Sequence, residues 1–448
     1  MTAVIEPSVA TTSADRFGRS WAGRRVTVVG LGKSGVAAAD LLCHLGCRVR
    51  VTEARHTPAF EPVRQQLLAA GVEQVELGGH TARVLDDAEL VVVSPGVPET
   101  SLPMAAAGAR RLPIMSEIDL AFHFCPSPII AVTGTNGKST AVTLIANMLR
   151  ASGRAAIACG NIGTPFSSVV RSLTPQTTAV VEVSSFQLLS CTQFRPSIGV
   201  LLNVASNHLD RHANAEQYLA AKARLFQQQQ HQDWAVLNGR DARMVALAKR
   251  LRARCAWFGD NRDNPPALRI AEETQRLLDD NAQAVLQTAR VLGIADPLTW
   301  QVLRSFRGLE HRMERVATVR GVNFINDSKS TTPESLLYAL QHVRGDVVVI
   351  LGGRNKGLDF SLLADPLRAA RVKGVVLIGE ARSQLRALFN GTPTVRQADS
   401  LQEAVAAARA CATPGTTVLF SPACASFDMF RDFEDRGRAF KAIVQQLR

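Results

Sequence analysis

The sequence predicts an α/β fold of three consecutive domains, each built on a mostly parallel sheet. The chain has 448 residues, and at about 150 residues per domain this length favours roughly three domains. Apolar, strand-like runs alternate with helix-like segments along the chain, which is typical of parallel α/β sheets. Two glycine-rich turns, at residues 30–35 and 134–137, each stand between such a strand and such a helix.

Composition and charge narrow the class of protein. Hydrophobic residues make up 46% of the chain and charged residues 20%, as in a globular protein with an ample core. No apolar run approaches the roughly 20 residues that span a bilayer, so we expect no membrane partner. The formal net charge of +12 is compatible with nucleic-acid binding, but the sequence has no basic clusters interleaved with aromatic residues. We therefore expect small anionic molecules, and no nucleic acid, as partners.

The cysteines and the N-terminus indicate the compartment. Eight cysteines without paired spacing do not form a disulfide framework, which favours a reduced, cytoplasmic setting. The first 22 residues contain an acid and a proline but no continuous apolar core, so they are not a secretory signal. We expect residues 1–22 to form a flexible lead-in.

The first expected domain, residues 23–126, begins with a strand, a glycine-rich turn and a helix. The turn, residues 30–35, reads GLGKSG, and Glu53 ends the next strand, at 47–54; a later strand is expected at 89–98. A GxGxxG turn followed by such an acid is typical of a Rossmann-like dinucleotide site. However, the free N–H groups of a helix N-terminus hold any diphosphate. The motif therefore predicts a site for a diphosphate and a ribose, and an NAD-dependent oxidoreductase remains one alternative.

Strands and helices also alternate in the second expected domain, residues 127–307, and in the third, residues 308–448. We expect a P-loop-type ATPase domain followed by a Rossmann-like domain. The expected strands are 129–134, 178–185, 198–204, 234–238, 322–328, 346–353, 374–380 and 416–423, and the expected helices include 214–227 and 435–447. Gln227–Gln230 is expected to extend the first of these helices into solvent.

Residues 132–140, VTGTNGKST, differ from the usual phosphate loop because Val132 stands where its first glycine is expected. The loop still follows an apolar strand and precedes a helix, and its backbone N–H groups can form an anion-binding nest. We expect Lys138 to bridge the β- and γ-phosphates of ATP and a hydroxyl to face Mg²⁺. The expected ATP-binding residues of the loop are Gly134, Thr135, Asn136, Gly137, Lys138, Ser139 and Thr140.

The shortened loop resembles that of the Mur ligase and folylpolyglutamate synthase superfamily, ATP-dependent enzymes that form amide bonds. Six further segments resemble the Mur ligase family: GNIG (160–163), EVSSFQL (182–188), NHLDRH (207–212), GLEHRMER (308–315), NDSKSTT (326–332) and SPACASFDMFRDFEDRG (421–437). The resemblance covers nearly the whole chain from about residue 24. SSFQL, DSKxT and SPACAS in this order are highly specific.

This resemblance implies an ATP-dependent ligase that adds glutamate to UDP-N-acetylmuramoyl-L-alanine through an acyl phosphate, a cytoplasmic step of peptidoglycan synthesis. D-Glutamate is the expected amino acid, with an L-glutamate-adding relative as the alternative. A folylpolyglutamate synthase is disfavoured because a separate GxGxxG domain would be superfluous. A catalytically impaired relative is a further alternative, since the family's H-N-x-x-N adenine segment is replaced by LLDDNAQAV, in which only Asn281 corresponds. Members of the family usually act as monomers.

The resemblance also assigns roles in the central domain. The expected catalytic residues are Lys138, Asn161, His208 and Lys222. Two Mg²⁺ ions are expected on Ser139, Glu182, His208 and Lys222, the last carbamylated so that a cation becomes a carboxylate. Asn281 is expected near ATP, and Asn161, Gln187 and His208 at the muramoyl-alanine end of the UDP-substrate.

In the outer domains the resemblance implies three further sets. The uridine diphosphate is expected on Lys33, Ser34, Glu53, Arg55, Ser94 and Gly96. ATP is expected to meet Arg312, Asp327 and Lys329 from the third domain. Glutamate is expected on Thr331, Lys356, Ser426 and the backbone at Phe433, with Arg354 as a second possible carboxylate partner.

Overall fold

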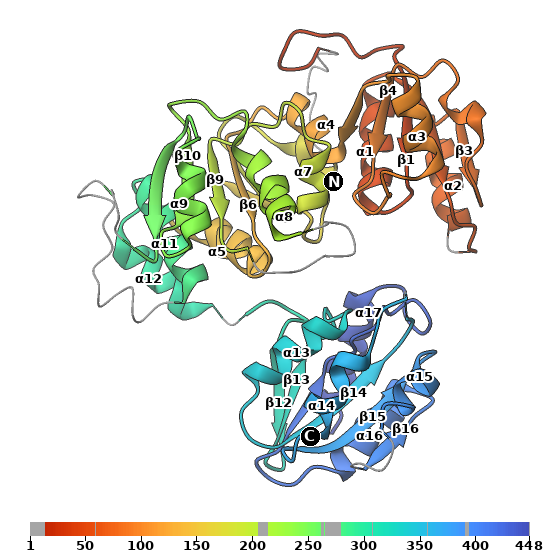
Figure 1. The fold of residues 1–448 in the computed structure, drawn as a ribbon, viewed down its shortest axis with the longest axis vertical. Coiled ribbons are helices and arrows are strands. Elements are labelled where there is room, and N and C mark those ends of the chain that lie inside the picture. The colour runs from red at the N-terminus through yellow and green to blue at the C-terminus, as the bar shows by residue number, and fades with distance from the viewer. Residues whose placement is uncertain are drawn as a thin grey trace, which may run out of the picture. The chain divides into compact units, whose positions relative to one another are not determined.

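The computed structural model describes residues 14–58, 60–204, 214–260, 264, 279–306, 308–355, 357–389 and 394–447. The chain divides into two compact units, Met1–Phe306 and Arg307–Arg448. The first unit contains two sheets and the second contains one, each with helices packed around it (Figure 1). The predicted α/β fold with three sheet-centred domains is confirmed.

The first sheet has the order β3-β2-β1-β4-β5, and all its strand pairs are parallel. This order is that of a Rossmann-type sheet. Its strands are β1 (Arg25–Val29), β2 (Arg48–Glu53), β3 (Gln74–Leu77), β4 (Leu90–Val93) and β5 (Ile114–Ser116). Its helices are α1 (Lys33–His44), α2 (Phe60–Ala69), η1 (Ala82–Leu85), α3 (Leu102–Ala109) and α4 (Glu117–Phe124).

Strand β1 shows why the apolar runs form buried parallel strands. Val26 and Val28 pack into one hydrophobic cluster, whereas Val29 packs into another on the opposite face of the sheet. Both faces are covered by helices, so a continuous β-branched run is buried on each side. The short strands β3 and β5 were not predicted, because neither carries such a run.

The central sheet has the order β11-β10-β9-β6-β8-β7 and is also fully parallel. Its strands are β6 (Ile129–Thr133), β7 (Ala156–Gly160), β8 (Thr178–Glu182), β9 (Ile198–Leu201), β10 (Trp234–Asn238) and β11 (Arg254–Phe258). Its helices are α5 (Lys138–Ala151), α6 (Phe166–Val169), η2 (Val170–Ser172), α7 (Ser185–Leu189), α8 (Ala215–Ala223), η3 (Arg224–Phe226), α9 (Ala242–Ala248), α11 (Asp280–Val291) and α12 (Asp296–Ser305).

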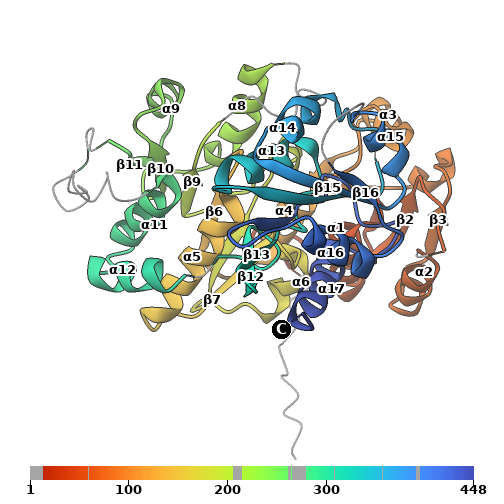
Figure 2. The ribbon, with the colours of Figure 1, turned by 90° about the horizontal axis from the view of Figure 1, so that it is seen from below.

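Helix α5 packs against β6 in the middle of this sheet. Ile130 and Val132 of β6 share a buried cluster with Val142 and Ile145 of α5. Helices α11 and α12 pack against α5, and the three helices lie close together in both ribbon views (Figures 1 and 2). The loop between β6 and α5 is therefore held at the centre of the sheet's carboxyl edge.

The glutamine run at 227–230 does not extend a helix into solvent, contrary to expectation. The short η3 ends at Phe226, and Gln229 is fully buried. Its Nε2 atom donates hydrogen bonds to the carbonyl oxygens of Pro196 and Trp234, both at 3.0 Å. Gln229 thus satisfies backbone groups of neighbouring segments, which a pattern of adjacent residues does not reveal.

The lead-in is packed where the structure describes it, at residues 14–22. Trp21 is buried in the core of the first unit. The carboxylate of Asp15 accepts hydrogen bonds from Trp21 Nε1 at 3.1 Å and from the backbone N–H groups of Phe17 and Arg19, and it lies 2.8 Å from His123 Nδ1. Residues 14–22 are therefore packed against the first unit, and the flexibility of the lead-in stays a prediction.

The sheet of the second unit has the order β12-β13-β17-β14-β15-β16, and only β12 pairs antiparallel within its described part. Its strands are β12 (Glu314–Val319), β13 (Val322–Asn326), β14 (Val347–Gly352), β15 (Val372–Ile378), β16 (Val395–Gln397) and β17 (Thr417–Phe420). Its helices are α13 (Pro333–His342), η5 (Ser361–Leu363), α14 (Ala364–Arg368), α15 (Arg382–Arg386), α16 (Leu401–Ala410) and α17 (Phe433–Gln445).

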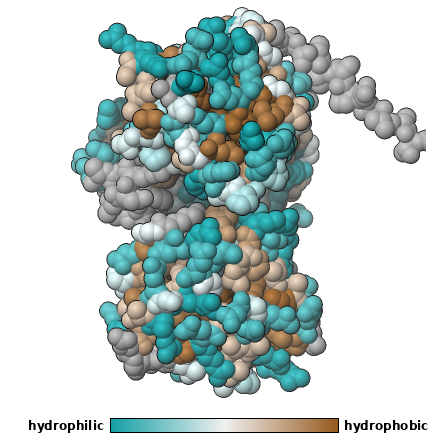
Figure 3. Space-filling model, turned by 90° about the vertical axis from the view of Figure 1, so that its right-hand side faces the viewer, coloured by the Kyte–Doolittle hydropathy of each residue, from teal (hydrophilic) through white to brown (hydrophobic). Residues whose placement is uncertain are grey.

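The surfaces of both units mix polar and apolar side chains, as is usual for globular proteins (Figure 3). Within the residues that the structure describes, no helix is long and apolar enough to cross a membrane.

Candidate active site

The loop between β6 and α5 presents its backbone at the carboxyl edge of the central sheet. Gly137 is the N-cap of α5 and has φ +82°, a left-handed conformation that glycine adopts without strain. A Cβ atom at Gly137 would lie 2.1 Å from Oδ1 of Asn281, the second residue of α11. The loop thus needs glycine both for its backbone conformation and for the close approach of Asn281.

Asn203 holds the phosphate loop, a role that was not predicted from the sequence. Its Oδ1 atom accepts hydrogen bonds from the N–H groups of Thr135 and Asn136, at 3.1 and 2.9 Å, and its Nδ2 atom donates to Asn136 O at 3.2 Å. Asn203 follows β9, the strand next to β6. The available sequence signal was its position near the end of the expected apolar strand 198–204.

Two lysine side chains bind the same loop carbonyl. Lys138 Nζ donates to the carbonyl oxygens of Gly134 and Thr135, both at 2.8 Å. Lys222 Nζ, from α8, donates to Gly134 O at 3.0 Å and lies 4.3 Å from the ring centroid of Tyr218. Burial lowers the pKa of Lys222 to about 6, and the nearby charge of Lys138 contributes. The Lys222 amine is therefore predominantly neutral near pH 7.

Three polar side chains meet at the end of β8, beside the loop. The buried carboxylate of Glu182 accepts a hydrogen bond from Ser139 Oγ at 2.7 Å and another from Asn161 Nδ2 at 2.9 Å. Within the described residues, no group of three or more His, Cys, Asp or Glu side chains is placed to hold a metal. Mg²⁺ usually takes one or two carboxylates together with waters and substrate phosphates. The oxygen donors of Glu182 and Ser139 fit such an ion, and His208 lies outside the described residues.

Two side chains near this cluster carry buried polar atoms without a hydrogen-bond partner among the described residues. Gln187 Oε1 accepts from the N–H and hydroxyl of Ser184 in a capping box at the start of α7, which leaves its Nε2 donor unsatisfied. Asn281 Oδ1 is likewise unsatisfied where it approaches Gly137. Buried polar atoms of this kind are candidates for contact with a ligand.

The expected diphosphate residues lie at the carboxyl edge of the first sheet, where doubly wound sheets bind ligands. Glu53 accepts hydrogen bonds from Leu31 N at 2.9 Å and from Arg55 Nε at 2.8 Å. Burial raises the pKa of Glu53, but these hydrogen bonds outweigh it and the net pKa is lowered. Ser94 Oγ donates to Gly30 O at 3.1 Å. Glu53 and Ser94 thus brace the glycine-rich turn, whereas Lys33, Ser34, Arg55 and Gly96 are at least partly exposed.

In the second unit, the expected ATP-contacting residues lie around the end of β13. Asp327 is buried and accepts hydrogen bonds from Ser421 Oγ at 2.8 Å and from Met313 N at 3.1 Å. Burial raises the pKa of Asp327 to about 6. Lys329 Nζ lies 5.7 Å from the ring centroid of Phe433, and Arg312 precedes Met313 in the same turn.

The residues of this unit that are expected to bind the substrate glutamate differ in exposure and in their present partners. The carbonyl of Phe433 accepts from Ser328 Oγ at 2.8 Å, Ser426 is buried, and Thr331 is half-buried. Arg354, considered as a second carboxylate partner, is already paired with Glu380 at 2.7 Å. Lys356 lies outside the described residues.

Arg436 connects two of the sequence motifs of this unit and was not singled out from the sequence. Its guanidinium donates to Ser328 Oγ, Ser328 O and Cys424 O at 2.8–3.0 Å. It is almost fully buried, and burial lowers its pKa to about 10. Its location in the 421–437 segment was the available signal.

Family comparisons match all three sheet-centred domains. The MurD-like N-terminal domain of Mur ligases matches residues 24–116, the Mur ligase middle domain matches 132–288, and the Mur ligase glutamate ligase domain matches 311–424.

Curated relatives extend the match to nearly the whole chain. Proteins named UDP-N-acetylmuramoylalanine–D-glutamate ligase from Chlorobaculum tepidum and Pelotomaculum thermopropionicum are 41% and 38% identical, and each alignment covers 95% of this chain and 98% of the relative. The protein of that name from Koribacter versatilis is 37% identical with the same coverage.

Solved structures share the fold at low sequence identity. The MurF ligase from Thermotoga maritima, in complex with ADP, superposes with a TM-score of 0.57 at 16% identity, covering 95% of this chain and 96% of that one. A pseudomurein peptide ligase type C from Methanothermus fervidus gives 0.53 at 16% identity, covering 95% and 100%. With its three matched domains and its full-length relatives, the chain belongs to the Mur ligase family.

Proposed function

We propose that this protein is an ATP-dependent ligase that joins D-glutamate to UDP-N-acetylmuramoyl-L-alanine. The observation that carries the proposal is the convergence of Lys138, Lys222 and the Glu182–Ser139–Asn161 cluster on one phosphate loop. The reaction type follows from this site, and the substrates follow from the relatives named above.

The reaction has two balanced steps. A carboxylate oxygen of the UDP-substrate attacks the γ-phosphorus of ATP, the bond to the bridging oxygen breaks, and ADP leaves. The glutamate amine then attacks the acyl carbon, loses a proton, and releases inorganic phosphate as the amide forms. The first step depends mainly on positioning and on neutralising charge on the transferred group.

Residues of the central domain supply that positioning and charge. Lys138, which now binds two loop carbonyls, would exchange them for phosphate oxygens. Glu182 and Ser139 would hold Mg²⁺, which neutralises phosphate charge when bound. Asn161, fixed by Glu182, would orient the acyl end of the UDP-substrate, and Gln187 would offer its unsatisfied Nε2 donor there.

We infer that Lys222 is carbamylated in the active protein. Its amine is buried, and its pKa of about 6 leaves it neutral and nucleophilic at pH 7. Nζ would attack CO₂, form an N–C bond and lose a proton, which converts the neutral amine into an anionic carbamate. The carbamate would then supply a second anionic oxygen ligand for Mg²⁺ beside Gly134.

The outer domains would hold the other substrates. Residues 23–126 would bind the uridine diphosphate at the Gly30–Gly35 turn, 127–307 would bind Mg-ATP, and 308–448 would bind glutamate. We expect the protein to act as a monomer in the cytoplasm. All eight cysteines are free, which supports a reducing compartment.

The deciding experiment measures phosphate release with Mg-ATP and UDP-N-acetylmuramoyl-L-alanine, with D-glutamate in one arm and L-glutamate in the other. Release that requires D-glutamate supports the proposal. A preference for L-glutamate keeps the mechanism and changes the substrate. If neither arm releases phosphate while the UDP-substrate still binds, the protein is a catalytically impaired relative.

A further inference from the structure

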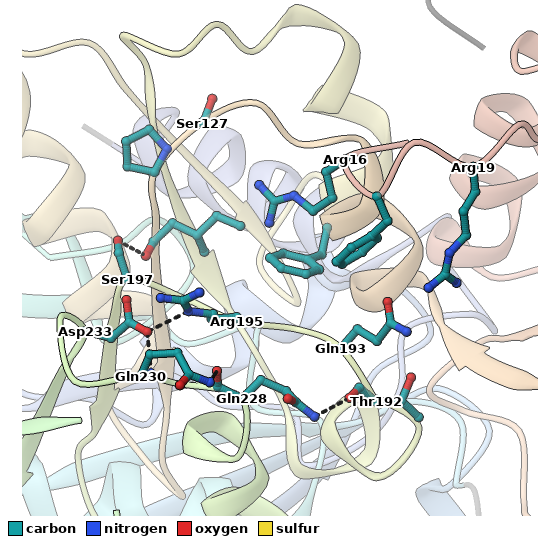
Figure 4. A pocket seen from close by; sticks show the side chains of 14 residues that line it. Arg16, Arg19, Ser127, Thr192, Gln193, Arg195, Ser197, Gln228, Gln230 and Asp233 are labelled. Atoms are coloured by element: carbon teal, nitrogen blue, oxygen red, sulfur yellow. Dashed lines mark hydrogen bonds and ion pairs between the residues drawn. The ribbon is translucent and has the colours of Figure 1, made fainter. Parts of the chain in front are cut away.

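A hollow of about 840 Å³ lies in the first unit, on the side of the central sheet away from the phosphate loop. It forms around the amino ends of β6, β9 and β10, whereas the phosphate loop follows the carboxyl end of β6. Its volume is within the roughly 300–1,000 Å³ of small-molecule sites. The side chains that matter here are Arg16, Phe17, Arg19, Gln193, Arg195 and Asp233 (Figure 4).

The packed part of the lead-in builds one wall of this hollow. Asp15 binds the backbone N–H groups of Phe17 and Arg19, at 2.9 and 3.0 Å, and thereby fixes the turn that carries Arg16. The Arg16 guanidinium donates to Cys125 O at 2.8 Å and lies 4.0 Å from the ring centroid of Phe122. The position of Arg16 is therefore set by packing and hydrogen bonds.

Positive charge in the hollow exceeds negative charge. Arg195 is paired with Asp233 at 2.7 Å, whereas Arg16 and Arg19 have no carboxylate within ion-pairing distance among the residues described. Burial lowers the pKa of Arg16, and the positive charge of Arg195 contributes to this shift. Arg16 and Arg195 both line the hollow, so an anion bound in it would lie near both positive charges.

The hollow also offers an unsatisfied acceptor and an aromatic ring. Gln193 Oε1 is buried without a hydrogen-bond partner in the described part of the chain, while Gln193 N is held by Asp119 at 3.1 Å. The ring of Phe17 is 46% exposed, with the Arg19 guanidinium 5.3 Å from its centroid. A ligand with an N–H or O–H donor would reach Gln193 Oε1 after a turn of the Gln193 amide toward the hollow, and its flat apolar face would stack on the ring of Phe17.

We propose that this hollow binds a small organic anion, whose phosphate or carboxylate lies between Arg16 and Arg195 and whose N–H or O–H group donates to Gln193. Arginine suits such oxyanions because its planar guanidinium can donate two parallel hydrogen bonds. The site is separate from the ligase reaction, since it lies at the opposite edge of the central sheet.

The first test titrates the intact protein with three probes in a calorimeter. 4-Aminophenyl phosphate and 4-aminobenzoate both carry an N–H donor and a ring, but one has a phosphate and the other a carboxylate. Aniline is their neutral counterpart. We expect at least one anion to bind with a Kd of about 1 mM or below, and aniline roughly tenfold more weakly. The stronger of the two anions identifies the oxyanion class.

The second test assigns the binding to the hollow. Arg16→Gln and Arg195→Gln are each expected to raise the Kd about tenfold, and Gln193→Met about threefold. Arg171→Gln removes an exposed arginine of the same unit that pairs with Asp40, and it should leave the Kd unchanged. Lys138→Met should also leave it unchanged, because the phosphate loop is not involved.

Three results would overturn the site. These are no anion binding below about 20 mM, loss of binding in Lys138→Met, or equal weakening by Arg171→Gln and the hollow variants. Thermal melting of each variant shows whether it is folded. If Arg16→Gln does not fold, Arg195→Gln decides, because Arg195 lies outside the lead-in that Arg16 joins to Cys125.

Discussion

At the loop between β6 and α5, the side-chain nitrogens of Lys138 and Lys222 both donate to one carbonyl oxygen, that of Gly134. Burial disfavours the charged form of Lys222, and the nearby charge of Lys138 disfavours it further. Lys222 is therefore the lysine of this pair that loses its proton more readily. Its lowered pKa favours a neutral, nucleophilic amine.

Lys222 should make stability depend on pH. Its folded pKa of about 6 lies below the ordinary lysine pKa of 10.5, so the unfolded chain binds more protons between these values and stability rises with pH there. The expected gain from pH 7 to pH 9 is about 2.5 kcal/mol. Lys222→Met should lose this part of the pH dependence, measured by urea denaturation in CO₂-free buffer.

The matched control is Lys249→Met, which replaces an exposed lysine after α9. It should retain the pH dependence of the unchanged protein. Identical pH profiles for the unchanged protein and Lys222→Met would contradict a depressed pKa.

Asn203 should act on ATP through the loop that it holds. Asn203→Ala removes the acceptor of the Thr135 and Asn136 N–H groups, and one such lost interaction is worth about 1–2 kcal/mol. We expect the KM for ATP to rise about tenfold, with the KM for the UDP-substrate nearly unchanged. Steady-state phosphate release measures both values.

Asn147→Ala provides the comparison, because Asn147 lies on α5 and binds Arg150 instead of the loop. It should leave both KM values unchanged. A general loss of activity in Asn203→Ala, with both KM values raised equally, would argue against a specific effect on ATP.

At the scale of elements, the glycines of the first turn have different physical roles. A Cβ atom at Gly35 would lie 1.9 Å from Gly30 O, whereas one at Gly32 would meet nothing within 4 Å. Gly32 has φ −73°, which any residue adopts. Gly35 is therefore required for packing of α1 on β1, and Gly32 leaves open the space that a diphosphate would approach.

These roles predict opposite effects of two alanine substitutions. Gly35→Ala should destabilise the protein by roughly 2 kcal/mol or more through overpacking. Gly32→Ala should leave Tm unchanged or slightly raised but weaken binding of the UDP-substrate. Differential scanning calorimetry and substrate titration separate the two. Equal effects of both variants on Tm would contradict the distinction.

Residues 14–22 of the lead-in are packed in place because Asp15 hydrogen-bonds to Trp21 and to His123 of α4. Asp15→Ala would leave Trp21 Nε1 and His123 Nδ1 without their acceptor, which should lower stability by about 2 kcal/mol. The measurement is the shift in Tm. Asp40→Ala, which removes an exposed acid paired with Arg171, should cause little change, and a similar loss in both would contradict the anchoring role.

At the scale of the whole molecule, charge is the property that acts beyond single contacts. Lys and Arg number 51 and Asp and Glu 39, for a formal net charge of +12. The proposed substrates are anions, so the protein's field should favour their approach. The effect is screened by salt over a Debye length of about 10 Å at 0.1 M.

We therefore expect the KM for the UDP-substrate to rise severalfold between about 0.02 and 0.3 M KCl, since the Debye length shortens over this range. The measurement is phosphate release at each salt concentration. Tm over the same range shows that the protein stays folded. A KM independent of salt would show that the field of the whole molecule does not contribute.

Structural features that are set by residues close together in the sequence were predictable from the sequence. The strand, turn and helix at residues 132–140 are specified by a buried apolar run, glycine, and an adjacent helix-forming segment. The parallel sheets followed from alternation of such units. Strands β3, β5, β7, β11, β12 and β16 were not predicted. The shortest of them, β3, β5 and β16, have only three or four residues, which carry too little pattern.

The sequence by itself thus determined the fold class, the two glycine-rich turns and the candidate residues around them. Only the tertiary structure decided which of them meet. Asn203 accepts a hydrogen bond from Thr135, 68 positions away in the sequence. Glu182 accepts one from Ser139, and Arg354 forms an ion pair with Glu380. The physical reason is that burial, pKa and hydrogen-bond partners arise from segments packed together in space. Neither the neutral state of Lys222 nor the arginine-lined hollow is encoded in any local pattern.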